Sequence, residues 1–167
     1  MLCAVLFGIS ACDREAEDGE DDEGGRGSIS EPDERCLTNE RWSAGDRESS
    51  MMYPGRDCVA CHADRDEAEE INLAGTIYGG VNELDDCFGV ADVEIVLTGA
   101  DGTVVTLMSN DAGNFSREHL SIQLPYTAKV VYEGRERPMV MAQTELSCNS
   151  CHAQTGLNNA PGRIVAP

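Results

Sequence analysis

Residues 93–108 read VEIVLTGADGTVVTLM, and this stretch decides the fold. Val93, Ile95 and Leu97 fall on every second position, which is the period of a β-strand that buries one face. The pair Asp101-Gly102 is a strong signal for a tight hairpin turn, and residues 103–108 return as the partner strand. The stretch therefore predicts an antiparallel β-hairpin.

Further strand signals lie on both sides of this hairpin. They cover residues 72–78, Phe115 after the turn cluster NDAGN at 110–114, residues 126–132, and residues 137–142 after a turn at Gly134-Arg135. Short strands with frequent turns and no helical periodicity indicate a mainly β chain. We expect a small antiparallel β-sandwich of about six or seven strands, flanked by two irregular or short-helical segments.

Each flanking segment holds the pattern Cys-x-x-Cys-His, as CVACH at residues 58–62 and as CNSCH at residues 148–152. Two thiols at this spacing can reach the two vinyl groups on one edge of a haem, and the following histidine can bind the iron. Two of the three histidines and four of the eight cysteines fall into these two copies. The sequence therefore predicts two haem c groups, with thioether bonds at Cys58, Cys61, Cys148 and Cys151 and proximal iron ligands His62 and His152.

Two other chemistries are open to the cysteine pairs. Four thiolates can hold zinc, although zinc ribbons usually separate their pairs by about 15–20 residues, and this reading gives the two histidines no role. The pairs can also form disulfides or a thioredoxin-like redox site, although no βαβ pattern surrounds either copy.

The sixth iron position needs a second ligand on each haem. The candidates are the methionines near the two motifs and the third histidine: Met51, Met52, Met139, Met141 and His119. Methionine opposite histidine raises the reduction potential relative to two histidines. Core packing is the alternative role for the methionines, and a solvated loop position is the alternative for the histidine. If neither kind of residue binds, an open iron allows peroxidase-like chemistry.

Two arginines near the motifs are candidates for contacts with the haem propionates. Arg56 precedes the first motif and Arg163 follows the second. A guanidinium can hold a carboxylate with two hydrogen bonds. The alternative is that both are ordinary solvated arginines.

The N-terminal residues 1–12 suggest export. Residues 2–9 form an apolar run far shorter than the ~20 residues of a membrane-spanning helix. The following ISAC at residues 9–12 resembles the lipobox of bacterial lipoproteins, although no Lys or Arg precedes the apolar run. The resemblance implies cleavage before Cys12, lipidation of Cys12, and anchoring to a bacterial membrane on the periplasmic or cell-surface side. An ordinary hydrophobic N-terminus is the alternative.

Export leaves one pair of cysteines for a disulfide. If Cys3 is removed with the signal, Cys12 carries lipid and four thiols hold haem, then Cys36 and Cys87 remain. Disulfides persist in oxidising compartments. We expect Cys36 and Cys87 to pair, with two free thiols as the alternative.

Charge limits the classes of partner. The net charge of −19 argues against nucleic acid, whose phosphates require a basic face. Residues 13–35 are rich in Asp, Glu and Gly, which predicts a disordered acidic tether. An acidic surface suits redox partner proteins with basic patches.

Four short segments of the predicted sandwich carry a family resemblance. Together AGTIY at 74–78, GVADV at 89–93, NDAGNF at 110–115 and LPYT at 124–127 resemble the carboxypeptidase regulatory-like, or transthyretin-like, β-sandwich. One departure is Ile77, where the family has Val. The resemblance covers residues 71–142 and implies a fold, but little about activity. With a haem motif on each side, the whole chain resembles small exported dihaem cytochromes of the bacterial lipoprotein type.

The sequence therefore predicts five regions: a lipoprotein-type signal at 1–12, the tether at 13–35, a first haem-binding segment at 36–70, the sandwich at 71–142 and a second haem-binding segment at 143–167. The predicted function is one-electron transfer by an electron carrier that is not an enzyme. Self-association into a multi-subunit or filamentous conduit is a variant of it. The alternatives are a non-redox surface lipoprotein that binds a partner, with disulfides or zinc at the cysteine pairs, and a haem peroxidase-like enzyme.

Overall fold

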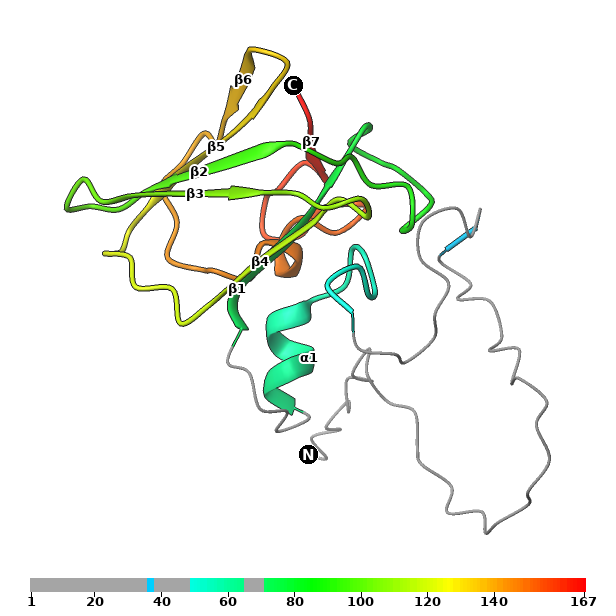
Figure 1. Ribbon diagram of the computed structural model, residues 1–167, viewed down its shortest axis with the longest axis horizontal. Helices are drawn as coiled ribbons and strands as arrows, with labels where there is room; N and C mark the ends of the chain where they lie inside the picture. The colour runs from blue at the N-terminus through cyan, green and yellow to red at the C-terminus, as the bar shows by residue number, and fades with distance from the viewer. Residues whose placement is uncertain (1–35, 38–48, 65–70) are drawn as a thin grey trace, which may run out of the picture.

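A computed structural model describes residues 36–37, 49–64 and 71–167, in which two β-sheets pack face to face (Figure 1). One sheet has the strand order β4-β1-β7 and the other has the order β3-β2-β5-β6. The strands are β1 (Ile71–Tyr78), β2 (Glu94–Thr98), β3 (Val104–Met108), β4 (Asn114–Glu118), β5 (Thr127–Tyr132), β6 (Arg135–Pro138) and β7 (Ile164–Val165). The fold is mainly β with little helix, which confirms the predicted small β-sandwich.

The hairpin that the sequence predicted joins β2 to β3. The two strands pair antiparallel from Thr98 opposite Val104 to Glu94 opposite Met108. In the turn, the Asp101 carboxylate accepts hydrogen bonds from the backbone N–H and the hydroxyl of Thr103, both at 2.9 Å. Gly102 has φ +84°, a conformation that glycine adopts without steric cost.

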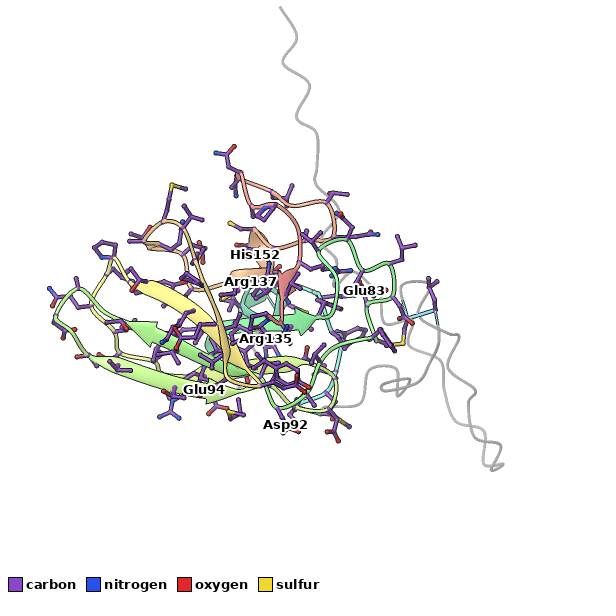
Figure 2. All side chains as sticks on the ribbon, turned by 90° about the horizontal axis from the view of Figure 1, so that it is seen from above. Glu83, Asp92, Glu94, Arg135, Arg137 and His152 are labelled. Carbon is purple, nitrogen blue, oxygen red and sulfur yellow. A yellow bond between two sulfur atoms is a disulfide. The ribbon has the colours of Figure 1, made fainter. Side chains whose placement is uncertain are left out.

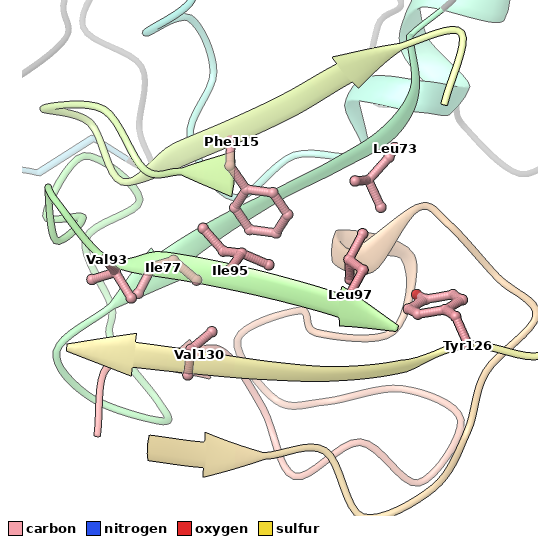
Figure 3. Close-up of a cluster of buried hydrophobic side chains, with 8 residues drawn as sticks. All are labelled: Leu73, Ile77, Val93, Ile95, Leu97, Phe115, Tyr126 and Val130. Atoms are coloured by element: carbon pink, nitrogen blue, oxygen red, sulfur yellow. The ribbon is translucent and has the colours of Figure 1, made fainter. Parts of the chain in front are cut away.

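The core lies between the two sheets (Figure 3). Its buried side chains come from both layers: Leu73, Ile77, Val93, Ile95, Leu97, Phe115, Tyr126 and Val130. Removing each of these apolar side chains from water contributes about 1.5–3 kcal/mol before the entropy of ordering is subtracted. This core fixes the distance between the sheets and so the positions of everything attached to them.

The last predicted strand was wrong in its bounds, because β6 covers 135–138 and not 137–142. Glu133 and Gly134 form the tight turn, with φ of +50° and +75°, so pairing already begins at Tyr132 opposite Arg135. β6 ends at Pro138, and the Met139 N–H that follows it still donates to the Ala128 carbonyl of β5 at 2.8 Å.

β1 is the strand that positions both cysteine motifs. Leu73 and Ile77 face the core, whereas Thr76 and Tyr78 are also buried, so both faces of β1 are covered. The first motif forms the helix α1 (Cys58–Asp64), the second begins with the 3-10 turn η1 (Cys148–Ser150), and both contact β1. After η1 the chain returns as β7, which pairs parallel with β1 and adds a strand from beyond the predicted sandwich region.

Within the described ranges, no helix is both long and apolar enough to cross a membrane. The predicted signal at 1–12, with its lipidation site Cys12, and the predicted tether at 13–35 lie outside the described residues.

Candidate functional site

The second motif folds as a single helical turn beside β1. The Cys151 N–H donates to the Cys148 carbonyl at 3.2 Å, and the His152 N–H donates to the same carbonyl at 2.9 Å. Gly75 of β1 allows this turn to approach closely, because a Cβ there would lie 2.9 Å from the Cβ of Cys148. The turn therefore brings the two sulfurs and the imidazole to one place.

The imidazole of His152 is oriented by a backbone carbonyl. Its Nδ1 lies 2.9 Å from the carbonyl oxygen of Gly162, and a carbonyl can only accept, so Nδ1 carries the proton. Neutral His152 therefore keeps its lone pair on Nε2. Histidines that bind metals characteristically donate their other ring N–H to such a group.

Both cysteines and the histidine of this motif line a cavity of about 430 Å³. The cavity lies between the inner face of the four-stranded sheet and the C-terminal segment, and most of its lining is apolar. The lining includes the core residues Ile95, Leu97, Phe115, Tyr126 and Val130. Its volume falls in the range of about 300–1,000 Å³ that is typical of small-molecule and cofactor sites.

Two of the predicted distal ligands, Met139 and Met141, line the same cavity as His152. Neither lies on a strand, although the predicted strand at 137–142 included both, because β6 ends at Pro138. Met139 is half-buried, whereas Met141 is 60% exposed and Val140 is 97% exposed. An apolar segment is thus held over the cavity opening with much of its surface in water.

Burial raises the pKa of one thiol in each motif. Burial, then the neighbouring Cys151 and Glu145, raises the pKa of Cys148 from 9.0 to about 12. Burial, then the charge of Asp57, raises the pKa of Cys58 from 9.0 to about 11. Catalytic redox thiols instead have lowered pKa values. This finding disfavours a thioredoxin-like redox pair at either motif.

The first motif lies on α1, where helical spacing puts Cys58, Cys61 and His62 on one side. Asp57 caps the helix by accepting a hydrogen bond from the Ala60 N–H at 3.0 Å. Nδ1 of His62 is buried and has no hydrogen-bond partner in the described part of the chain. The first imidazole therefore has no orienting carbonyl like the one at His152.

Cys61 is disulfide-bonded. Its sulfur is therefore not free for the predicted thioether in this state, and that bond would have to be reduced first. Cys58, Cys148 and Cys151 are free thiols. The pair Cys148 and Cys151 therefore does not form the disulfide that was the alternative prediction for the motif cysteines.

Hydrogen bonds join the second motif and the residue before it to the residues that precede the first motif. The Ser147 hydroxyl donates to the Asp57 carboxylate at 2.5 Å, which joins the residues that precede the two motifs. Asn149, inside the second motif, donates from Nδ2 to the Arg56 carbonyl at 2.8 Å. Segments about ninety positions apart in the chain therefore meet across β1.

Thr76 of β1 is the centre of this junction. Its backbone N–H donates to Oδ1 of Asn149 at 3.2 Å, and its hydroxyl donates to Oδ1 of Asn114 at 2.8 Å. The same hydroxyl oxygen accepts from the Gly55 N–H at 2.9 Å and from Nδ2 of Asn149 at 3.1 Å. We call Thr76, Asn114 and Asn149 the amide hub. It fixes the segment before the first motif against the second motif.

The predicted disulfide pair, Cys36 and Cys87, is joined in the structure, with a Cα–Cα distance of 4.9 Å. The two other predicted distal ligands, Met51 and Met52, pack against this disulfide. Methionine packing was the alternative role for them, and neither lines the cavity at His152.

No zinc site forms from the motif cysteines within the described ranges. The one group of three metal-ligating side chains found there is Cys36, Asp85 and Cys87. Both sulfurs of this group are joined in the disulfide. Oδ1 of Asp85 accepts hydrogen bonds from the backbone N–H groups of Leu37 and Cys87. This group is therefore structural.

Of the two predicted arginines and the third histidine, Arg163 alone lines the cavity at His152. Arg163 lines the cavity but is 2% exposed, is ion-paired with Asp86, and stacks 4.3 Å from the ring centroid of Tyr78. Its guanidinium is thus engaged with Asp86 and Tyr78 inside the protein, and its propionate contact stays a prediction. Arg56 stacks on Tyr53 at 5.0 Å from the ring centroid, and His119 is exposed at the end of β4. Neither Arg56 nor His119 lines the cavity at His152.

Sequence reasoning missed the two cations of β5 and β6 that line the cavity, Lys129 and Arg137. It also missed the amide hub, because asparagines in loops usually cap turns. The signal that could have found Arg137 is its place on a strand that follows a hairpin turn, opposite a core valine.

Comparison with known proteins gives no relative: no protein family, curated protein or solved structure matches this chain. The family resemblance therefore stays a prediction, and the fold rests on the structure itself.

Proposed function

We propose that this protein is a dihaem c-type cytochrome that transfers one electron at a time. The observation that carries the proposal is the cavity at the second motif, which Cys148, Cys151 and His152 line together with apolar core residues. A haem needs such a combination: an apolar site, two thiols at one edge and an imidazole nitrogen for iron.

The residues of the second motif have distinct tasks. Cys148 and Cys151 would hold haem through thioethers, which form when a thiol adds across a vinyl group. His152 would bind iron through Nε2, because the Gly162 carbonyl holds the proton on Nδ1. The bound group would supply a reversible one-electron ferric–ferrous couple.

Met139 is the stronger candidate for the sixth ligand at this site. It is half-buried and lines the cavity, and its backbone is fixed by an N–H bond to the Ala128 carbonyl at 2.8 Å. Met141 lines the cavity too, but its side chain is mostly exposed. A thioether ligand here would raise the reduction potential.

The first motif would hold the second haem on α1, through Cys58, Cys61 and His62. Because Ser147 bonds Asp57 and Asn149 bonds the Arg56 carbonyl, the two attachment segments are held against each other. The two redox centres would therefore lie near one another, which favours electron transfer within the chain. The sandwich serves as the frame.

The partners and location follow from the sequence and belong to the same proposal. Partners would be redox proteins with basic patches, which the charge of −19 would attract over a distance. The chain would be exported and anchored by lipid at Cys12 to a bacterial membrane, on the periplasmic or cell-surface side. Self-association into a conduit is an extension of this reading.

The test is to produce the full chain with a c-type haem maturation system and measure haem by the alkaline pyridine haemochrome spectrum and intact mass. We expect two covalently bound haems per chain. If the chain holds one haem, and a Cys148→Ser/Cys151→Ser variant loses it, the proposal is limited to the second motif. The disulfide of Cys61 is then structural. A chain without haem would refute the proposal and favour the binding-module alternative.

His152→Ala tests the ligand, with His119→Ala as the matched control because that histidine is exposed and outside the cavity. The first variant should change the low-spin spectrum of one haem only, and the control should leave that haem unchanged. An unchanged spectrum in His152→Ala would remove this histidine as ligand. Rapid spectral change of the unsubstituted protein with peroxide would instead indicate an open iron and the enzyme alternative.

A further inference from the structure

Two arginines of β6 lie on the face of the sheet where core residues are expected. In the antiparallel register, Arg137 lies opposite Val130 and Arg135 lies opposite Tyr132. Directly opposed residues project to the same face, and Val130 and Tyr132 belong to the core side. An inward-facing charge on a strand is costly unless it meets water or an anionic group.

Arg137 differs from the other cations around the cavity in its surroundings. Lys129 is paired with Glu136 at 2.7 Å, and Arg163 is buried in its ion pair with Asp86. Arg137 is exposed, lines the cavity and forms no ion pair within the described ranges. Figure 2 shows Arg137 on β6 and His152 on the C-terminal segment, the two elements that enclose the cavity.

We infer that Arg137 binds a propionate carboxylate of the haem at the second motif and so sets the orientation and potential of that haem. This inference rests on the proposed function. The two vinyl substituents and the two propionates lie on opposite sides of a haem, so fixing the vinyl side at Cys148 and Cys151 directs the propionates away from them. Arg137 on β6 lines the cavity, and its positive guanidinium matches the negative charge of a propionate.

The physical effect of Arg137 is electrostatic. A carboxylate held by guanidinium is largely neutralised, so less negative charge acts on the iron. Reduction to the ferrous state adds one negative charge, and a nearby cation favours it. Arg137 is therefore a positioning residue that raises the potential of one haem.

The test compares Arg137→Gln with Arg135→Gln in the full-length holoprotein. Arg135 is a matched control because it lies on the same strand and the same face, but it pairs with Glu133 at 3.6 Å and does not line the cavity. Both variants shorten the side chain by the same amount, keep a polar end and remove one charge. Spectropotentiometric titration measures the two haem potentials, and the pyridine haemochrome spectrum measures haem content.

Arg137→Gln should shift the reduction equilibrium of one haem about three- to tenfold toward ferric, which lowers its midpoint potential by about 30–59 mV. Arg137→Lys should restore part of the shift, because charge returns without the two-bond geometry. Arg135→Gln should leave both potentials in place. If Arg137→Gln and Arg135→Gln hold two haems and have equal potentials, this inference is overturned while the proposed function stands. If the protein holds no haem, both are overturned.

Discussion

Replacing Asn149 with alanine should separate structural support from haem attachment. Asn149 is one of the two variable residues of the second Cys-x-x-Cys-His pattern, so attachment chemistry does not require it. Yet it is 6% exposed, and it bonds the Thr76 N–H and hydroxyl and the Arg56 carbonyl. The substitution removes a side chain that joins the two haem-binding segments.

The cost can be worked out from the groups left behind. In Asn149→Ala the Thr76 N–H loses its acceptor, and the Arg56 carbonyl loses its amide donor but keeps the Cys58 thiol, whose Sγ lies 3.6 Å away. A buried polar group without its partner costs about 1–3 kcal/mol. The Thr76 hydroxyl keeps Gly55 and Asn114, so the Thr76 N–H counts in full and the Arg56 carbonyl in part, and we expect a loss of about 3 kcal/mol. At an m-value of about 2 kcal/mol/M, this loss lowers the urea midpoint by about 1.5 M.

Urea unfolding followed by circular dichroism measures this change, and Ser150→Ala is the matched control. Ser150 is the neighbouring variable residue, is half-buried, and donates only locally, to the Ser147 carbonyl at 2.6 Å and weakly to Cys151. It should cost about 1 kcal/mol or less. If both variants unfold within about 1 kcal/mol of each other, the amide hub does not join the segments and the argument for closely spaced haems loses its support.

Two further predictions concern the cysteines. Replacing Cys36 and Cys87 together with serine opens a link with a sequence separation of 51, which should reduce the free energy of unfolding by about 4 kcal/mol in the chain-entropy model; a change under 1 kcal/mol in urea unfolding would contradict this. In apoprotein, burial raises the thiol pKa of Cys58 to about 11 and of Cys148 to about 12. The two neutral thiols therefore stabilise the fold below pH 9, and this stabilisation is lost as the pH rises from 9.0 toward 12. Thioethers do not titrate, so unfolding curves of holoprotein across that range should lack this part of the decline; equal declines in apoprotein and holoprotein would show that these thiols are not the attachment atoms.

Local pattern predicted the strands well because their reasons are local. The alternation of Val93, Ile95 and Leu97 and the Asp101-Gly102 turn need no distant partner, and the structure has the hairpin as expected. The error at β6 was local too. A two-residue turn at Glu133-Gly134 starts the strand two positions earlier, and the strand ends at Pro138.

Long-range pairing could not be predicted in the same way. β7 is a two-residue strand, Ile164–Val165, and it exists because β1 offers an open edge beside Ile77 and Tyr78. Likewise, the burial of Arg163 depends on Asp86, which is 77 positions away in the chain. Neither the pairing of β7 with β1 nor the ion pair of Arg163 with Asp86 leaves a periodic pattern in the sequence, so neither could be predicted from propensity or spacing.

The lining of the cavity opposite the second motif could not be predicted from the motif alone. A Cys-x-x-Cys-His turn fixes two sulfurs and an imidazole, but it does not specify which surface lies across from them. That surface is supplied by β5 and β6, whose register puts Val130 beside Arg137, and by the segment after Pro138 that brings Met139 over the opening. An apolar wall, a thioether and a cation thus reach the motif from one hairpin. A redesign of the Glu133-Gly134 turn that shifted this register by one residue would turn Arg137 to the outer face, and it would change the haem environment without altering either motif.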